Sequence, residues 1–534
     1  MEQRLKDLEE ARAKILRGGG EEKIAKQHNK GKLTARERID LLLDPGSFHE
    51  ISKLIGHLSG TPGDGIISGH GKIDGRKVFV YAQDATVKGG SIGFQHGIKL
   101  YKTVEMALEM RVPIIGLNDS PGARTPKMQE VMAISEMGKG SGDSKDSTGF
   151  EGMGMFALLS DKHGGSVFAP NTFASGVIPQ ISAIMGTCAG IAVYSPALTD
   201  FIYMIDKTSQ MFITGPGIVK LTLGEDVTPE ELGGAKIHSK LTGVSDFRCK
   251  DEKECLSEIR RLISFLPLNC DEEPPVVKTG DDPERTCDEL MDFVPTDTSK
   301  PYDVIRVIKC LVDNGDFLEV KKEFAGEIAV GFGRMDGYTV GFVANQPKVR
   351  AGSLTVDSSD KQARFIRFCD CFNIPIVLLV DTPAYMPGSA QEHAGIIRHG
   401  AKVLYALCEA TVPRIGLVLR KAYGGGNLGM GVIPGMQTDM ILNWPTMETG
   451  VLGPEQSIML FSGGKNYSKE EMAEMVKMYR DTFANPIRDA NANTNLHDVI
   501  TPSETRKYLI RSLEIFRGKK RIRYPDRKHG NIPL

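Results

Sequence analysis

The sequence lacks the features that mark membrane, secreted and metal-binding proteins. None of its apolar runs approaches the roughly 18 residues needed to span a bilayer, and the charged N-terminus MEQRLKDLEEARAKIL has no apolar segment of a signal peptide. The nine cysteines form no C-x-x-C pair, which favours reduced thiols over a zinc ribbon or a disulfide framework. A formal net charge of -2 argues against a general binder of nucleic acids or membrane surfaces. We therefore expect a cytoplasmic protein.

The sequence also lacks the commonest catalytic motifs. It has no P-loop, no H-E-x-x-H and no G-x-G-x-x-G after a first strand. Gly89–Gly93 fits the G-x-S-x-G turn of a serine nucleophile, but Ala351-Gly-Ser-Leu-Thr stands at the matching place of an internal repeat, so we interpret it as a structural turn. Met475–Met478 faintly matches the sequence around a biotinylated lysine. We reject this reading, because the segment belongs to an amphipathic helix that Ser468 would cap.

What the chain does contain is an internal repeat. The segment Gly69–Pro121 aligns without a gap with Gly331–Pro383, at an offset of 262 residues, and 15 of the 53 aligned pairs are identical. Average composition would give about 6% identity by chance. Further along, Val177-Ile-Pro-Gln aligns with Thr411-Val-Pro-Arg, and the first half carries 28 more residues between these anchors. Two copies of one fold are the strongest structural inference from the sequence.

Each copy has the same expected order of elements. Apolar runs joined by Asp-Gly, at Asp74 and at Asp336, are typical of a hairpin. A glycine-rich turn and a helix follow, near Gly97–Arg111 and Ser359–Asn373, and then a buried strand that ends in a tight turn before proline. A further strand leads into a second glycine turn. This alternation predicts an α/β protein with helices packed over sheets and ligands near the strand ends.

We predict four segments: an N-terminal helical extension (1–68), a first domain (69–267), a linker rich in proline and acidic residues (268–300) and a second domain (301–534). Residues 136–165, rich in Gly, Ser and Asp, account for the extra length of the first copy. The composition is compatible with a mobile lid over substrate and equally with a surface loop.

Two glycine turns at equivalent places are the remaining chemical candidates. One contains Gly190 and Ile191, and the other contains Gly424, Gly425 and Gly426. A glycine-rich turn that enters a helix points free backbone N–H groups outward at the positive end of the helix dipole, and a pair of such groups stabilises an oxyanion. Helix–sheet packing is the alternative role. The duplication favours two oxyanion sites, because they suit a reaction with two enolate-like partners.

At this point a family resemblance is visible. The chain resembles the biotin-dependent carboxyltransferases, in particular the β subunits of propionyl-CoA and related acyl-CoA carboxylases. The matching motifs run from about residue 30 to 460: LTARERIDLLLDPGSF, GGSIG, SPGAR, IPQISAIMGTCAG, AVYSPALTDF, MFITGP, EDVTPEELGGAKIHS, VANQPKVRAGSL, SSDKQARFIRFCDCFNIP, GIIRHGAKVLYA, EATVPRI, RKAYGGG and WPT. The resemblance implies two duplicated crotonase-like domains, each a β-β-α superhelix.

The resemblance also implies a reaction, the transfer of a carboxyl group between carboxybiotin and the α or vinylogous γ carbon of an acyl-CoA. The first domain would hold the acyl-CoA, and the second domain of a partner subunit would hold carboxybiotin. Carbon dioxide is released from carboxybiotin, the ureido oxygen of biotin removes the α-proton of the thioester, and the enolate attacks the carbon dioxide. No side-chain base and no metal are required.

By similarity, the site residues fall into three groups. The amides of Gly190 and Ile191 would bind the thioester oxygen, and those of Gly425 and Gly426 would bind the biotin oxygen. The acyl-CoA would lie near Ser120, Gly122, Ala123, Arg124 and Ala189. The biotin and acyl pocket would be lined by Tyr423, Gly424, Asn427 and Leu428.

Four departures from the family pattern leave the acyl group open. Ile191 replaces a glycine, and the turn GGGNLGMG resembles the methylcrotonyl type. The segment DTPAYMPG (381–388) replaces a Val-Pro-Gly-Phe pattern, and residues 136–165 are an insertion relative to propionyl-type members. A branched, unsaturated or dicarboxylic substrate is as well supported as propionyl-CoA.

Three alternative functions are compatible with the sequence. The same transfer could run in reverse, as in glutaconyl-CoA and methylmalonyl-CoA decarboxylases, whose membrane partner releases carbon dioxide. A crotonase-type enoyl-CoA hydratase would need acid/base carboxylates, for which Glu225 and Asp226 are candidates. The third is a non-catalytic scaffold subunit.

The expected partners follow from what the sequence contains. It shows neither an ATP-binding carboxylase module nor a credible biotinylated lysine, so we expect biotin to be supplied in trans on a carrier. The source would be a biotin carboxylase subunit or a membrane decarboxylase subunit. Family similarity implies a homohexamer, built as a dimer of trimers.

Overall fold

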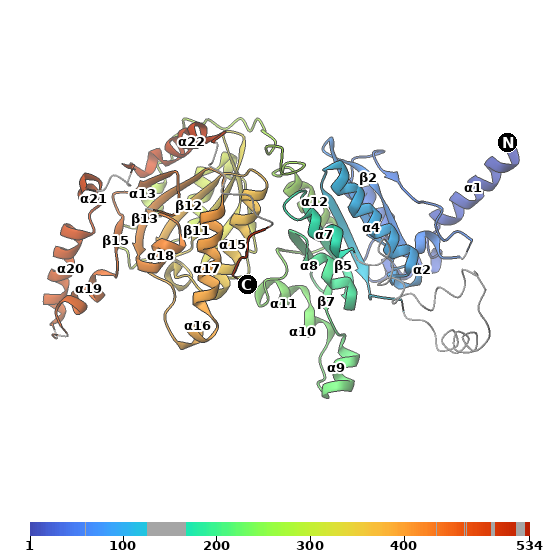
Figure 1. Ribbon diagram of the computed structural model, residues 1–534, viewed down its shortest axis with the longest axis horizontal. Coiled ribbons are helices and arrows are strands. Elements are labelled where there is room, and N and C mark those ends of the chain that lie inside the picture. Colours follow the sequence, from blue (N-terminus) through green and yellow to red (C-terminus); the bar gives the residue numbers. More distant parts are fainter. Residues whose placement is uncertain are drawn as a thin grey trace. The chain divides into compact units, whose positions relative to one another are not determined.

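In the computed structural model the chain divides into two compact units, Met1–Asp271 and Glu272–Leu534 (Figure 1). The structure describes residues 1–58, 60–124, 167–433, 435–463, 465, 467–492, 497–519 and 529–533. The insertion expected at 136–165 lies outside the described residues. No helix among the described residues is long and apolar enough to cross a membrane.

Each unit is built on one eight-stranded sheet of the same design. The first sheet has the order β1 (His49–Glu50), β2 (Ile66–Ile73), β3 (Arg76–Gln83), β4 (Ile114–Ser120), β5 (Gln180–Ala189), β6 (Phe201–Ile205) and β8 (Phe247–Cys249), with β7 (Gln210–Phe212) paired to β5. The second has the order β16 (Asp498–Val499), β14 (Met440–Asn443), β13 (Arg414–Tyr423), β12 (Ile376–Thr382), β11 (Tyr338–Asn345), β10 (Ile328–Met335) and β9 (Phe317–Val320), with β15 (Glu448–Gly450) paired to β13. In both sheets an antiparallel hairpin is followed by parallel strands.

The hairpins confirm the prediction from the two Asp-Gly pairs. Asp74 and Gly75 have φ values of 49° and 78°, and Asp336 and Gly337 have values of 53° and 78°. Positive φ at both central residues is what a tight two-residue hairpin turn needs. A distant carboxylate accepts hydrogen bonds from both turn amides, that of Asp44 in the first unit and that of Asp313 in the second.

Both units contain helices, some packed on the sheets and some extending away from them (Figure 1). In the first unit they are α1 (Glu2–Leu16), α2 (Glu21–His28), α3 (Ala35–Leu42), α4 (Phe94–Met110), α7 (Phe168–Ala174), α8 (Tyr194–Ala197), α9 (Pro216–Leu223), α10 (Pro229–Gly233), α11 (Ala235–Lys240) and α12 (Glu252–Ile263). In the second they are α13 (Leu290–Phe293), α14 (Val304–Leu311), α15 (Val356–Cys371), α16 (Ser389–His393), α17 (Ile396–Glu409), α18 (Gly424–Gly429), α19 (Pro454–Phe461), α20 (Lys469–Phe483), α21 (Pro486–Ala492) and α22 (Thr505–Phe516). Short 3-10 turns are η1 (Pro62–Gly65), η2 (Lys88–Gly90), η3 (Gly190–Val193), η4 (Asp313–Gly315), η5 (Arg350–Gly352) and η6 (Pro502–Glu504).

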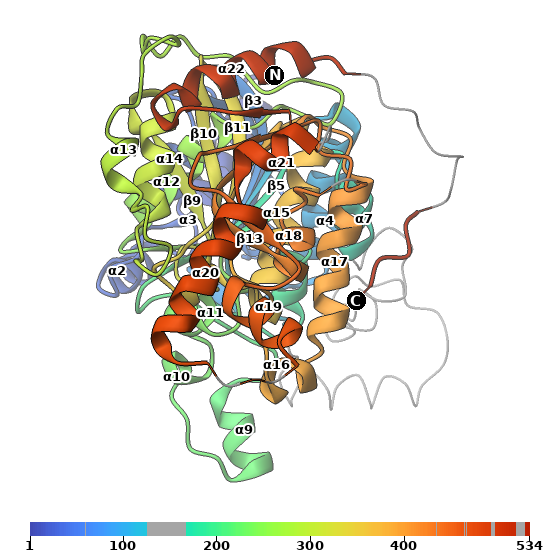
Figure 2. The same ribbon diagram turned by 90° about the vertical axis from the view of Figure 1, so that its left-hand side faces the viewer.

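Several helix predictions are confirmed. Helices α4 and α15 occupy the two predicted positions, and α20 begins behind Ser468, whose hydroxyl accepts a hydrogen bond from the amide of Glu471. Figure 2 shows unit 2 from the side of α19 and α20, which pack against each other at its edge. The Met475–Met478 segment is thus helical, unlike the hairpin that a biotinylated lysine requires.

A buried lysine occurs at the same position of both copies. Lys99 of α4 donates to the carbonyl of Ile66 at 2.8 Å, and Lys361 of α15 donates to the carbonyl of Ile328 at 2.7 Å. All four residues obey the 262-residue offset. Burial lowers the pKa of Lys99 to about 8 and that of Lys361 to about 7. Each lysine ties the central helix of its copy to the first hairpin strand.

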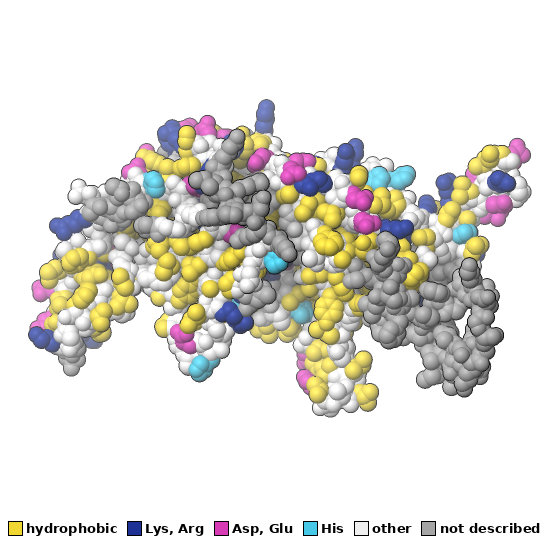
Figure 3. Space-filling model, in the orientation of Figure 1, with side chains coloured by type: hydrophobic (Ala, Val, Ile, Leu, Met, Phe, Trp, Pro, Cys, Tyr) yellow, Lys and Arg dark blue, Asp and Glu magenta, His cyan; other side chains and the backbone are white. Residues whose placement is uncertain are grey.

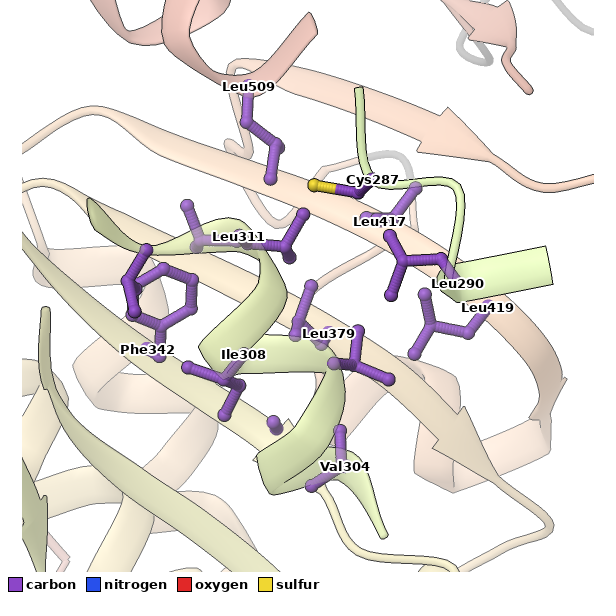
Figure 4. Packing of buried hydrophobic residues seen from close by; sticks show 14 of the residues in the cluster. Cys287, Leu290, Val304, Ile308, Leu311, Phe342, Leu379, Leu417, Leu419 and Leu509 are labelled. Atoms are coloured by element: carbon purple, nitrogen blue, oxygen red, sulfur yellow. The ribbon is translucent and has the colours of Figure 1, made fainter. Parts of the chain in front are cut away.

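One large core of the second unit lies where α14 and α22 pack on the sheet (Figure 4). Ile308 and Leu311 of α14 meet Phe342 and Leu417 of the strands, all fully buried. Part of the expected linker belongs to this core, because Cys287 and Leu290 are buried in it. These residues fold as part of the second unit, whose first residue is Glu272.

An aspartate at the end of the middle strand anchors each unit through a buried ion pair. In the first unit, Asp119 lies 2.7 Å from the Nζ of Lys32 and 3.1 Å from Nη1 of Arg38, which also pairs with Glu252 at 2.7 Å. The Arg38 side chain is completely buried. These contacts fasten α3 and α12 to the end of β4.

In the second unit the matching Asp381 lies 2.7 Å from Nε of Arg420, and both side chains are completely buried. The same guanidinium donates to the carbonyls of Pro295, Asp297 and Lys300. The partners therefore come from different segments, but the anchored aspartate is common to both copies.

We expect Arg38→Met to lower the free energy of unfolding by about 3 to 5 kcal/mol, because it leaves buried carboxylates short of a cation. Arg511→Met, on helix α22, removes a solvent-exposed pair with Glu284 and should cost less than about 1 kcal/mol. Urea unfolding followed by circular dichroism measures both. Equal losses for the two variants would contradict the anchoring role of Arg38.

Candidate active site

The first glycine turn follows directly from β5. The strand ends at Ala189, and Gly190 opens the 3-10 turn with a φ of 58°, a conformation that glycine adopts without strain. The loop after β4 packs against this turn, since a Cβ at Gly122 would lie 2.6 Å from the carbonyl oxygen of Ala189. Ser120 pairs with Cys188 across the two strands, and its Oγ accepts a hydrogen bond from the amide of Gly122.

The second glycine turn follows β13 in the same way. Tyr423 ends the strand, and Gly424 begins α18 with a φ of 48°. A Cβ at Gly424 would lie 2.6 Å from the carbonyl oxygen of Val451, and one at Gly426 would lie 2.9 Å from Cγ2 of Thr382. Glycine is therefore required at both positions by close packing against neighbouring chain segments.

Strand register shows which residues of the two turns correspond. Ser120 pairs with Cys188, and Thr382, its counterpart at the 262-residue offset, pairs with Ala422. Counting onward along each strand, Gly190 corresponds to Gly424 and Ile191 to Gly425. The amide pair predicted for the second turn, Gly425 and Gly426, thus lies one residue further along than the pair predicted for the first. The first amides of a helical turn have no acceptor within that turn, so a glycine turn of this kind can donate to a ligand.

The residues predicted around the first turn form two groups, four that lie at the strand ends and one, Arg124, whose side chain is bound within the fold. Ser120, Gly122, Ala123 and Ala189 come together at the ends of β4 and β5. Arg124 is engaged within the fold, because its Nη1 lies 2.6 Å from Oδ1 of Asp64 and its Nε donates to Oγ of Ser91. Ser91 in turn donates to the carbonyl of Lys88, as suits a structural turn.

The predicted residues around the second turn differ in exposure. The Tyr423 side chain is 4% exposed, and its hydroxyl donates to Oε2 of Glu448 at 2.6 Å. The ring therefore supports the turn from inside, and burial is the main cause that raises its pKa. Asn427 donates weakly to Thr449 at 3.5 Å, and Leu428 is 38% exposed.

Sequence reasoning missed several residues that build the site. Gln83 and Asn345 accept hydrogen bonds from the backbone amides of Asp119 and Asp381, at 2.9 Å and 3.1 Å. They occupy equivalent positions of the repeat, which was the available signal. Arg38 and Arg420 carried no such signal, because neither has a matching arginine in the other copy: Arg420 aligns with Gly186, and Arg38 precedes the repeat.

The first unit contains a largely apolar pocket beside the first turn, with about 550 Å³ of space when its open mouth is counted. Its walls come from the β3–α4 region, the end of β4, α7 and the turn itself. The lining residues are Gln83, Ile92, Gly97, Leu100, Asn118, Ala123, Val167, Phe168, Ile191, Ala192 and Ser195.

A second pocket of the first unit is basic, with about 720 Å³ of empty space. It lies between α1, the start of α2 and the loop that ends in Lys88. Its basic side chains are those of Lys14, Arg17, Lys23, His57 and Lys88, and no acidic residue lines it within the described part of the chain. Such a pocket suits an anionic ligand group.

Comparison with known proteins extends over the whole chain. The carboxyl transferase domain family matches residues 26–144 and 143–532. The chain is 47% identical over 546 residues to the propionyl-CoA carboxylase, carboxyltransferase subunit, of Haloferax mediterranei, with 100% of both chains covered. It is 45% identical to the methylmalonyl-CoA decarboxylase subunit alpha of Veillonella parvula, covering 100% of this chain and 99% of that one.

A solved structure shows the same fold. Transcarboxylase 12S, a hexamer assembly with hydrolyzed methylmalonyl-coenzyme A bound, superposes with a TM-score of 0.89 at 42% identity, covering 100% of this chain and 99% of that one. The expected pair of similar crotonase-like α/β units is thereby confirmed. With family, relatives and fold in agreement from end to end, this chain belongs to the carboxyl transferase domain family.

Proposed function

We propose that this acyl-CoA carboxyltransferase works with biotin supplied in trans on a carrier protein, as the subunit that moves a carboxyl group between biotin and an acyl-CoA. One observation carries the proposal: in each unit a glycine turn that opens a helical segment begins at the same register position after the strand next to the middle strand. Two such turns provide for two carbonyl oxygens that gain negative charge, one on the thioester and one on biotin.

The residues of the first turn act on the thioester. When the α-proton leaves, charge moves onto the carbonyl oxygen, and the amides of Gly190 and Ile191 are placed at the end of β5 to donate to it. Gly122 allows the loop after β4 to approach the same turn closely. Together these groups orient the thioester without supplying a base.

The residues of the second turn fit a neutral ureido group. The amides of Gly425 and Gly426 are donors, and Tyr423, Thr382 and Tyr385 hold the turn in shape. Biotin, when bound, supplies both the carboxyl group and the base. No ionisable side chain is needed for this fit, because the donors are backbone amides.

Both directions of transfer, carboxylation and decarboxylation of the acyl-CoA, are compatible with the relatives. Identities of 47% to a carboxylase subunit and 45% to a decarboxylase subunit favour neither. The partner in the first case would be a biotin carboxylase, and in the second a membrane decarboxylase subunit. A hydratase is less well supported, because Glu225 and Asp226 are both exposed and Asp226 pairs with Lys220.

Coenzyme A would account for the basic pocket of the first unit. Its phosphate groups are anionic, and the loop that carries Lys88 continues through Ser91 to Ile92, which lines the apolar pocket. One ligand with a charged nucleotide end and an apolar acyl end would therefore meet both pockets through a shared loop.

A homohexamer would account for the apolar surface of α9. Its residues Ile218, Leu221 and Leu223 are 59%, 86% and 74% exposed, and no residue of the helix is buried (Figure 3). Contact with another subunit would remove this surface from water. The hexameric transcarboxylase 12S supports the same assembly.

Gly425→Pro removes one amide donor and should lower the rate of carboxyl transfer by about 100-fold or more. Gly425→Ala keeps that N–H, and its Cβ would lie 3.3 Å from the Tyr385 ring, so a smaller loss is expected. Labelled carboxyl transfer between biotin and an acyl-CoA measures both variants in each direction. Full activity of the proline variant, with unchanged circular dichroism, would favour the scaffold alternative.

The double substitution Arg17→Ala with Lys88→Ala should raise the KM for acyl-CoA by about threefold to tenfold, because two ionic contacts to phosphate are lost. The KM for the matching acyl-pantetheine, which lacks the nucleotide, should not change. Lys77→Ala, an exposed lysine outside the pocket, is the control. An equal rise for both substrates would count against phosphate binding here.

Leu221→Glu should shift the protein from hexamer to smaller species in light scattering after size exclusion, because it places a charge on an apolar contact surface. Thr222→Glu changes an exposed polar neighbour on the same helix and should leave the assembly intact. If neither substitution alters the mass, α9 is not part of a subunit interface.

A further inference from the structure

The apolar pocket beside the first turn has a counterpart in the second unit that is filled by protein. The comparison depends on which residues correspond. Ile92 forms an isolated bridge with Ala123, and Leu354 forms the same bridge with Tyr385, at the 262-residue offset. Position for position, therefore, the small side chain of Ala123 is replaced by the phenol ring of Tyr385.

The Tyr385 ring occupies the space that corresponds to the pocket. A Cβ at Gly425 would lie 3.3 Å from Cδ2 of Tyr385, and one at Gly429 would lie 2.6 Å from its hydroxyl oxygen. By strand register, Gly425 corresponds to Ile191 and Gly429 to Ser195. Both counterparts line the pocket of the first unit.

A third contact leads to the same place. Burial raises the pKa of Tyr385 to about 12, against a smaller opposing effect of the neighbouring Ser359 hydroxyl. Ser359 corresponds to Gly97, which also lines the pocket of the first unit. Three neighbours of the Tyr385 side chain thus correspond to three residues that line one pocket. In the second unit the Tyr385 ring fills the space that is a cavity in the first.

The pocket is built for an uncharged group. Among the described residues that line it, none is ionisable. The polar ones are engaged within the protein: Asn118 accepts from Tyr81, and Ser195 donates to Asn171. Gln83 accepts from the amide of Asp119 and faces His96, a histidine whose pKa burial lowers to about 3. A carboxylate placed here would lose its hydration without gaining a cation.

We propose that the pocket beside the first turn receives the non-transferred part of the acyl group, an uncharged apolar substituent, and that Tyr385 closes the corresponding pocket so that the second turn accepts a ligand without such a tail. This rests on the proposed carboxyl transfer and adds its substrate class. It also assigns Phe168, which forms the α7 wall of the pocket, as a determinant of acyl length.

The test uses the full-length protein and compares kcat/KM for carboxyl transfer to propionyl-, butyryl-, hexanoyl- and succinyl-CoA. Butyryl-CoA should be used at least about tenfold better than succinyl-CoA, which has the same length but ends in a carboxylate. Phe168→Ala should raise the ratio of hexanoyl- to propionyl-CoA by about tenfold, and Phe168→Trp should lower it. Phe173→Ala, 67% exposed on the same helix, should leave the ratio unchanged.

Tyr385→Ala should reduce transfer to all acyl-CoAs alike, because the tyrosine supports the second turn and not the acyl pocket. Calorimetric titration of each Phe168 variant with hexanoyl-CoA and with free CoA gives a readout that does not need turnover. Unchanged ratios and unchanged affinities in an active enzyme would overturn the pocket assignment. If the wild type transfers carboxyl to no acyl-CoA, the proposed function fails, while the calorimetry still decides the pocket.

Discussion

The buried carboxylate at the end of the middle strand is the constraint on which both units depend. Asp119 and Asp381 stand where β4 and β12 end, next to the strands that carry the glycine turns. Each is held through its backbone amide by Gln83 or Asn345 and through its side chain by a buried arginine. A buried carboxylate without a cation is strongly destabilising. Loss of the ion pair would therefore also disturb the strand ends that carry the aspartates.

That constraint explains how a site whose donors are backbone amides can have a well-defined geometry. Backbone amides are placed by the strands and turns that carry them, and groups anchored to regular elements are held more precisely than groups on loops. The glycines are required because a Cβ at Gly122, Gly424 or Gly426 would collide with the neighbouring chain. Conventional catalytic motifs are absent for the same reason, since the donors are atoms that every residue possesses.

The two copies share a scaffold and differ in what fills it. Ala123 and Tyr385 occupy one position of the repeat, and exchanging a methyl group for a phenol ring converts a pocket into packed protein. Under the proposed function, the duplication supplies two oxyanion turns, and small differences in side-chain volume give the turns separate ligands. The anchoring arginines, Arg38 and Arg420, also come from different segments, which shows that the ion pair was kept by different means in each copy.

The sequence by itself determined the duplication, the hairpins, the central helices and the glycine turns, because these follow from local patterns such as Asp-Gly pairs, apolar runs and the 262-residue offset. It also indicated the family through motifs spread along the chain. Residues 136–165 and the roles of the individual site residues stay predictions.

Only the tertiary structure decided which residues reach the ends of β4 and β12. Arg38 is 81 residues from Asp119 along the chain, and no local pattern announces a contact at that separation. The same holds for the basic pocket, which joins α1 to the loop around Lys88, and for the Tyr385 ring, since whether it fills a cavity depends on the space left by residues distant in sequence. Side-chain packing between remote segments is not encoded in periodicity, and so the pockets became visible only in three dimensions.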